Sequence, residues 1–265
     1  MFTKLSAEYL PLSIPADSAL TDELSIECMA SNKKSELIRS TGKEVEDFLR
    51  KVDLAPRPVP SKHRGRLIFG MDATASREPM WDQACHIQSE MFAVTAAHGG
   101  LDVQLCYYRG FREFYHSRWV SGAQQLQDLM GAARCVGGLT QIGRLLNHTI
   151  AESKNARVNA LVFVGDAVEE EIDKLSHKAG QLGLSGVPAF VFHEGYNPVA
   201  ERAFREIANL SGGAYCRFDA SSSQQLKDLL AAVALYAAGG RKALEHFGRN
   251  RRGPVAQLTH QIKRS

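Results

Sequence analysis

The sequence lacks the cysteine pattern of a disulfide-bonded or zinc-binding domain. Its cysteines are five in number and widely scattered: Cys28, Cys85, Cys106, Cys135 and Cys216. A disulfide framework usually has an even number of cysteines, and a zinc site usually has closely spaced pairs. We therefore expect reduced, buried thiols and a cytoplasmic protein.

A long apolar run is also missing. A membrane-spanning helix needs about 20 consecutive apolar residues, and no stretch of this sequence approaches that length. Residues 1–20 contain charged side chains and two prolines, Pro11 and Pro15, which is not the pattern of a secretory leader. We expect no membrane span.

The sequence has little net charge, only +3. Residues 241–265 are nevertheless basic, with seven lysines and arginines and a single acidic residue, Glu245. Single-stranded nucleic acid is usually bound by basic residues interleaved with aromatic ones, and Phe247 is the sole Phe, Tyr or Trp of this segment. We therefore expect a solvated tail here, and no nucleic-acid site.

The 265 residues, 44% of them apolar, suffice for one α/β core with appendages. A helical pattern over residues 42–52 is followed by a proline-rich stretch, 54–60, that fits neither a helix nor a central strand. We place a domain boundary in that stretch. The expected parts are an N-terminal extension with a helix and linker (1–60), an α/β domain (61–240) and a basic tail (241–265).

From Arg66 onward, apolar strands alternate with amphipathic helices, which is typical of a parallel sheet covered on both faces. The expected strands are residues 66–72, 101–108, 111–120, 160–164, 187–192 and 214–218. The expected helices are about residues 78–98, 123–133, 142–150, 169–182, 199–210 and 224–238. The very short link after residue 108 makes the third strand an antiparallel edge strand. The predicted fold is a doubly wound, mostly parallel six-stranded sheet.

Oxygen-bearing side chains follow two of these strands. Asp72, Thr74 and Ser76 come after the first strand, Thr140 follows two glycines in a loop, and Asp166 ends the strand expected beside the first. Taken singly, Asp72, Thr74, Thr140 and Asp166 each fit the role of a helix cap. Together they lie at the carboxyl edge of the sheet, where α/β folds bind ligands, and oxygen ligands suit hard cations. The sequence therefore predicts a divalent-metal site.

This constellation resembles the von Willebrand factor A domain, also called the integrin I-type domain, with its metal-ion-dependent adhesion site. The resemblance covers about residues 66–239, including the element order. The family pattern Asp-x-Ser-x-Ser appears as Asp72-Ala-Thr74-Ala-Ser76, and the later threonine and aspartate of the family correspond to Thr140 and Asp166. Thr74 replaces a serine but keeps its hydroxyl, and Ala167 stands where a glycine usually follows the aspartate.

The resemblance implies a non-catalytic protein-binding module that holds Mg²⁺ or Mn²⁺. The hydroxyls of Thr74 and Ser76 would bind the ion, and Asp72, Thr140 and Asp166 would contribute directly or through water. An Asp or Glu of a protein partner would complete the coordination. Stand-alone relatives resemble adaptors of ATPase or chaperone-like assemblies, so the resemblance also implies such a partner.

Two other groups invite interpretation. His193 and Glu194 end a strand at the same edge, where they would either shape the partner surface or touch its acidic group, or else form an ordinary polar pair in a loop. Glu169, Glu170 and Glu171 are expected in the first turn of a helix, where acidic side chains interact favourably with the helix dipole.

Other functions were compared with this hypothesis. Residues 72–76 contain no glycine, which excludes a P-loop or a dinucleotide fingerprint. A Mg²⁺-dependent phosphatase with an aspartyl nucleophile is a third hypothesis, although such an enzyme would carry a second aspartate where Thr74 stands. A scaffold that binds partners through the N-terminal extension or the basic tail, without metal, is the main alternative.

Overall fold

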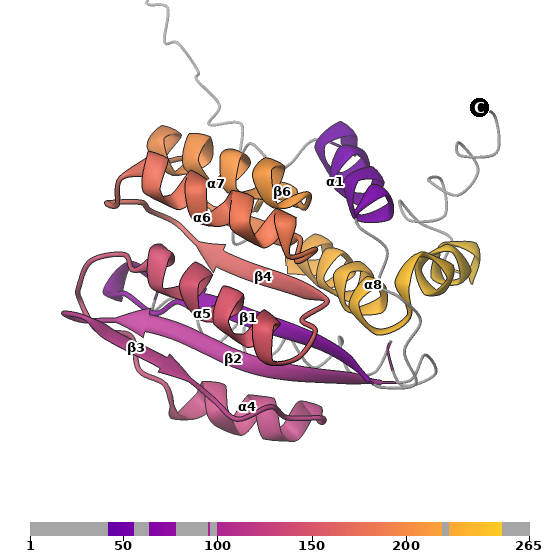
Figure 1. Cartoon of the computed structure of the whole chain (residues 1–265), viewed down its shortest axis with the longest axis horizontal. Helices are drawn as coiled ribbons and strands as arrows, with labels where there is room; N and C mark the ends of the chain where they lie inside the picture. Colours follow the sequence, from indigo (N-terminus) through magenta and orange to yellow (C-terminus); the bar gives the residue numbers. More distant parts are fainter. Residues whose placement is uncertain (1–41, 56–63, 78–94, 96–99, 219–222, 251–265) are drawn as a thin grey trace, which may run out of the picture. The chain divides into compact units, whose positions relative to one another are not determined.

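The computed structural model describes residues 42–55, 64–77, 95, 100–218 and 223–250 (Figure 1). All of them belong to one compact unit, Ile38–Ser265. The helix predicted over residues 78–98 lies outside the described residues, apart from Thr95, which is helical. The first 41 residues and residues 251–265 of the basic tail lie outside them as well.

The centre of this unit is a six-stranded sheet with the order β3-β2-β1-β4-β5-β6. Its strands are β1 (Gly65–Asp72), β2 (Leu101–Arg109), β3 (Glu113–His116), β4 (Ala160–Gly165), β5 (Ala189–Glu194) and β6 (Ala214–Phe218). All neighbouring pairs are parallel except β2 and β3, which are antiparallel. The predicted mostly parallel sheet with one antiparallel edge strand is therefore confirmed.

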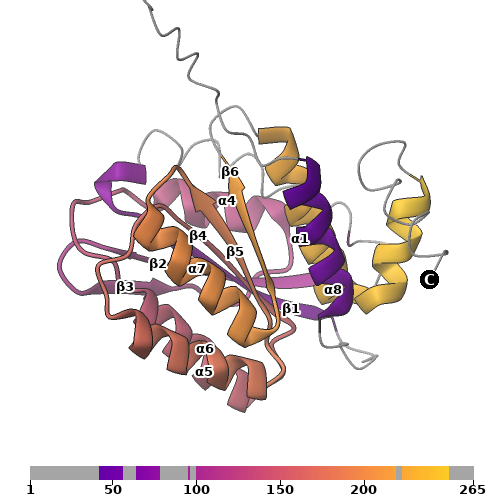
Figure 2. The same cartoon turned by 90° about the horizontal axis from the view of Figure 1, so that it is seen from above.

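Helices cover both faces of the sheet (Figure 2). They are α1 (Gly42–Leu54), the short 3₁₀ helix η1 (Ala75–Arg77), α4 (Ala123–Ala132), α5 (Ile142–Asn155), α6 (Ile172–Leu184), α7 (Pro198–Ser211) and α8 (Ser223–Asn250). Helices α1, α4 and α8 pack on one face, and α5, α6 and α7 on the other. Successive side chains of a strand point to opposite faces, so both sides of β1 are apolar: Leu67 and Phe69 face α8, and Ile68 faces α5. Among the residues just described, no helix has the length and apolar content needed to cross a membrane.

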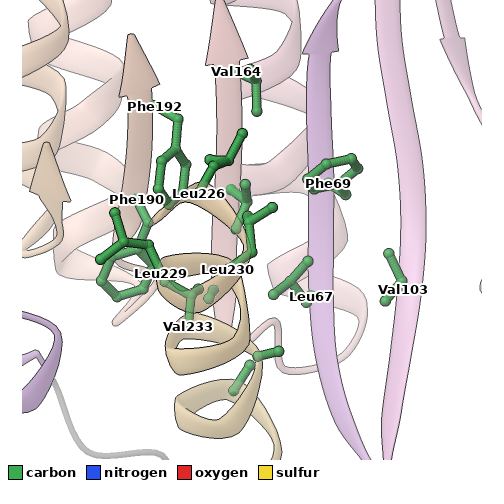
Figure 3. Packing of buried hydrophobic residues seen from close by; sticks show 14 of the residues in the cluster. Leu67, Phe69, Val103, Val164, Phe190, Phe192, Leu226, Leu229, Leu230 and Val233 are labelled. Carbon is green, nitrogen blue, oxygen red and sulfur yellow. The ribbon is translucent and has the colours of Figure 1, made fainter. Parts of the chain in front are cut away.

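Helix α8 forms the main apolar contact on its face of the sheet. Its Leu226, Leu230 and Val233 lie against side chains of β1, β4 and β5 (Figure 3). Helix α1 joins the same cluster, because the Phe48 ring lies 5.3 Å from that of Phe192 and 6.1 Å from that of Phe190. A helix that the sequence analysis assigned to the N-terminal extension therefore shares the core of the sheet.

Three predicted elements have different limits in the structure. Strand β3 is shorter than the predicted 111–120, because residues 110–112 form the turn and Val120 makes only an isolated bridge to Val103. Helix α6 begins at Ile172 instead of residue 169, because Glu169 binds Thr140 and Glu170 binds the first N–H groups of α5. Helix α8 continues to Asn250, beyond the predicted end at 238, and so crosses the predicted boundary at 240.

Gly65 allows α8 to approach β1 closely. A Cβ atom at this position would overlap the carbonyl group of Ala237. We expect Gly65→Ala to lower the free energy of unfolding by about 1–3 kcal/mol, because the backbones must separate. Gly180→Ala is the matched control: apart from its neighbours in α6, no atom lies within 4 Å of the added methyl, so it should raise stability by up to about 1 kcal/mol. Urea unfolding measures both, and equal effects would show that the contact of α8 with β1 is not tight.

Candidate metal centre

The first part of the candidate site lies where β1 ends and η1 begins. Asp72 and Thr74 are buried, whereas Ser76 is exposed. The backbone N–H of Thr74 donates to Oδ1 of Asp72 at 2.8 Å, which is a local turn that an aspartate often forms. The hydroxyl oxygens of Thr74 and Ser76 are 3.1 Å apart. Three oxygen-bearing side chains therefore lie together at the carboxyl edge of the central strand.

Asp166 reaches the same edge from β4. Strands β1 and β4 are paired in parallel, with Met71 opposite Val164, so Asp166 lies just past the residue opposite Asp72. Burial raises the pKa of Asp72, and the negative charge of Asp166 raises it further, although hydrogen bonds from Thr74 act in the opposite direction. The Oδ1 atom of Asp166 is buried and has no hydrogen-bond partner among the described residues.

Tyr108 is a site residue that was not among the predicted site residues. It is fully buried opposite Asp72 in the pairing of β1 with β2, and its hydroxyl donates to Oδ2 of Asp72 at 3.1 Å. Burial, together with the Asp72 carboxylate, raises the pKa of Tyr108 well above its ordinary value, so the phenol stays a donor. Only the strand register reveals this contact, and no sequence motif marks it.

Thr140 is held by reciprocal hydrogen bonds with Glu169. Its N–H donates to Oε2 of Glu169 at 2.6 Å, and its hydroxyl oxygen accepts from the N–H of Glu169 at 3.0 Å. The loop that precedes it is attached to the residue just after β1, since the N–H of Val136 donates to the carbonyl of Ala73 at 3.0 Å. These contacts bring Thr140 to the edge of the sheet that carries Asp72.

The acidic residues 169–171 do not form the first turn of α6 as predicted. Glu171 is the residue just before α6, and Glu170 accepts hydrogen bonds from the N–H groups of Ile142 and Gly143 at 2.5 and 2.9 Å. Glu170 therefore interacts with the N-terminus of α5, a favourable position for a carboxylate. Burial raises its pKa, and these two hydrogen bonds act in the opposite direction.

His193 is not on the partner surface that the sequence analysis predicted for it. It is buried in the core, its ring lies edge-on to Phe204 at 5.2 Å, and its Nδ1 is 2.8 Å from the hydroxyl of Tyr215. Burial lowers its pKa to about 4, with a further contribution from the charge of Arg217. The side chain faces inward because the residue still belongs to β5. Glu194, the last residue of β5, is half-buried.

The side chains at this edge fit a hard cation better than separate helix caps. The residue before α5 is Gln141 and the residue before α6 is Glu171, so neither Thr140 nor Asp166 occupies a cap position. Within the described part of the chain, no three His, Cys, Asp or Glu side chains are grouped so as to hold a metal ion. A cation here would need the hydroxyls of Thr74, Ser76 and Thr140 besides the two aspartates, which is a ligand set that Mg²⁺ or Mn²⁺ accepts.

Comparison with known proteins finds the same fold at low sequence identity. A von Willebrand factor type A protein from Catenulispora acidiphila matches with a TM-score of 0.52 and 14% identity, over 65% of this chain and 43% of that one. The SpRpn10 VWA domain matches with a TM-score of 0.51 and 10% identity, over 67% and 97%. The pilus adhesin SpaC from Lactobacillus rhamnosus GG, in an open conformation, matches with a TM-score of 0.51 and 12% identity, over 73% and 31%.

The first and third of these proteins are much longer than the matched region, since the chain spans less than half of each. The SpRpn10 domain, by contrast, is matched over nearly its whole length. No family model matches the sequence, and no curated protein matches it. At these identities the likeness concerns the fold.

Proposed function

Because the chain has the von Willebrand factor A fold, we propose that it is a non-catalytic protein-binding module that recruits its partner through a divalent metal. Asp72, Thr74, Ser76, Thr140 and Asp166 would hold Mg²⁺ or Mn²⁺, directly or through water. The partner would contribute the carboxylate of an Asp or a Glu. Among the structures that share the fold, SpaC is a pilus adhesin, which agrees with a role in binding.

The observation that carries this proposal is the pair of aspartates at the edge of β1 and β4. The negative charge of Asp166 helps to raise the pKa of Asp72, and the Oδ1 atom of Asp166 is buried without a hydrogen bond among the described residues. Two carboxylates in this arrangement cost folding free energy unless a positive charge compensates them. A cation between them supplies that charge. The hydroxyls of Thr74, Ser76 and Thr140 complete the protein's part of the ligand set.

The surrounding residues orient the ligands. The N–H of Thr74 and the hydroxyl of Tyr108 hold the two oxygens of Asp72, and the carboxylate of Glu169 accepts from the N–H of Thr140. When bound, the cation supplies a coordination position that a carboxylate of another molecule can occupy. The set contains only two aspartates, and contacts through water neutralise the charge of the ion only in part. The ion would therefore still attract a carboxylate of the partner.

Mn²⁺ titration with water-proton relaxation tests the site and its open position together. We expect one Mn²⁺ per chain and a strong relaxation enhancement, because water occupies the open position. A neutral peptide with a central aspartate should lower the enhancement, and the same peptide with asparagine should not. Asp166→Asn should weaken Mn²⁺ binding roughly 10- to 100-fold. Unchanged Mn²⁺ affinity in Asp166→Asn, or equal effects of the two peptides, would contradict the proposal.

A further inference from the structure

Three exposed apolar side chains lie beside the candidate metal centre. Phe111, at the turn between β2 and β3, is 80% exposed, and Leu139 and Val136, in the loop before α5, are 59% and 41% exposed. Leu139 precedes Thr140 in the sequence, and the N–H of Val136 donates to the carbonyl of Ala73. A group of large apolar residues next to a polar site is a common feature of protein-binding surfaces.

The two segments that carry these side chains are joined by backbone contacts. The N–H of Gly110 donates to the carbonyl of Val136 at 3.2 Å. Gly138 packs so closely on Gly110 that a Cβ atom would overlap the Gly110 carbonyl. The amide of Gln141 also donates to the carbonyl of Arg109 at 3.3 Å. The turn and the loop therefore present one fixed surface.

Arginines surround this apolar group. Arg144 donates to the carbonyl of Arg112 at 2.6 Å, and Arg134 donates to the carbonyls of Gly131 and Ala133. Arg112, Arg134 and Arg144 are exposed, and none of the three is paired with a carboxylate in the described ranges. Arg109 differs, because it forms an ion pair with Glu113 at 2.9 Å. The surface thus carries three arginines that form no ion pair in the described ranges.

Arg112 has an unusual backbone conformation. Its φ is 64°, and it is the sole residue other than glycine with a positive φ within the described residues. This conformation is unfavourable for a side chain with a Cβ, and a glycine would adopt it without strain. The charge of Arg112 is therefore present at a position where another residue type would stabilise the turn better, as is often the case at functional sites.

We propose that these six residues form a docking surface for an acidic protein segment that also carries apolar side chains. The surface, here called the arginine-rimmed patch, consists of Phe111, Arg112, Arg134, Val136, Leu139 and Arg144. This inference rests on the proposed function: one acidic residue of the segment would bind the metal, and further acidic residues would bind the three arginines. Its apolar side chains contact Phe111 and Leu139.

Charge complementarity favours an acidic protein over nucleic acid. Three unpaired arginines attract either one. Single-stranded nucleic acid also needs aromatic side chains on which its bases stack, and here Phe111 alone is both aromatic and highly exposed among the six. Under the proposed function, the adjoining metal centre binds a carboxylate. One acidic segment can therefore bind both the metal and the arginines.

Fluorescence anisotropy with a labelled peptide of repeating Glu-Glu-Leu tests the patch in full-length protein. The double variant Arg112→Gly, Arg144→Gln should bind this peptide about tenfold more weakly, because two charge-assisted contacts are lost. Its Mg²⁺ affinity by calorimetry should equal that of the wild type. The matched control Arg118→Gln, Arg202→Gln removes the same charge from exposed arginines outside the patch and should change peptide affinity by less than about twofold. Phe111→Ser should weaken binding of the Glu-Glu-Leu peptide and leave that of a Glu-Glu-Ser peptide unchanged.

The outcomes separate this proposal from the proposed function. If the patch variants bind the peptide as the wild type does while Mg²⁺ still enhances binding, the patch is wrong and the metal function stands. If Mg²⁺ does not bind but arginine-dependent peptide binding persists in EDTA, the metal function is wrong and the patch stands. Failure of the wild type to bind the peptide, or tighter binding of a labelled single-stranded DNA, would overturn the patch as a protein-docking surface.

Discussion

Asp72→Asn is expected to leave the metal-free protein at least as stable as the wild type and to weaken Mg²⁺ binding roughly 10- to 100-fold. The two effects have opposite signs because Asp72 is buried beside a second aspartate. Asparagine removes the like-charge repulsion and keeps an oxygen for the N–H of Thr74. Its amide can donate to the hydroxyl of Tyr108, which can also accept. The substitution therefore removes a charge and keeps a hydrogen bond between residues 72 and 108, although the hydrogen of the Tyr108 hydroxyl loses its acceptor.

Thermal unfolding with and without Mg²⁺ measures both effects. A ligand that binds only the folded state raises its stability in proportion to RT ln(1 + [L]/Kd). Addition of Mg²⁺ should therefore raise the Tm of the wild type and leave that of Asp72→Asn nearly unchanged. Asp102→Asn is the matched control, because Asp102 lies near the amino end of β2, where it binds Arg64 and Ser121. A Mg²⁺ response in Asp72→Asn equal to that of the control would exclude Asp72 as part of the site.

The second large effect concerns His193 and acidic pH. The folded state lowers the pKa of this histidine from 6.5 to about 4. Below pH 6.5 the unfolded chain therefore binds a proton that the folded chain does not, so stability falls as the pH decreases from 6.5 to about 4 and then levels off. A shift of this size corresponds to a loss of about 3 kcal/mol.

Comparison with His193→Gln isolates this contribution. Glutamine retains a polar group for the Tyr215 hydroxyl and does not titrate, so the difference in unfolding free energy between wild type and variant should decrease by about 3 kcal/mol between pH 7 and pH 4. The difference is needed because burial raises the pKa values of Asp72 and Glu170, which stabilises the folded state as the pH falls. An NMR titration of the wild type gives the pKa of His193 directly, and a value near 6.5 would refute the prediction even if the variant does not fold.

The fold was largely predictable because its strands are apolar on both faces and its helices are periodic. The six strands, and the neighbourhood of β1 and β4 that brings Asp166 beside Asp72, followed from this alternation. Element ends were less predictable where a tertiary contact competes with local propensity. Glu169 and Glu170 have the composition of a first helical turn, yet they bind the N–H groups of Thr140 and of α5.

The parts of the site that could not be predicted depend on register and on side-chain direction. The hydroxyl of Tyr108 reaches Asp72 because the two residues are paired across β1 and β2, and periodicity alone does not specify that pairing. His193 ends a strand at the expected edge, but its ring points into the core. A shift of one residue along a strand reverses the face of a side chain, so a position at the sheet edge is not enough to place it on the surface.

The reciprocal hydrogen bonds between Thr140 and Glu169 link the loop after α4 directly to the loop after β4. Glu170 extends this connection to the first N–H groups of α5. If the Thr140 hydroxyl turns towards a cation, it loses its contact with the Glu169 amide, and the segment leading into α6 is released on that side. Cation binding would in this way change the contacts at the N-terminal ends of α5 and α6, which lie on the face of the sheet opposite α8. No hinge or domain movement would be required.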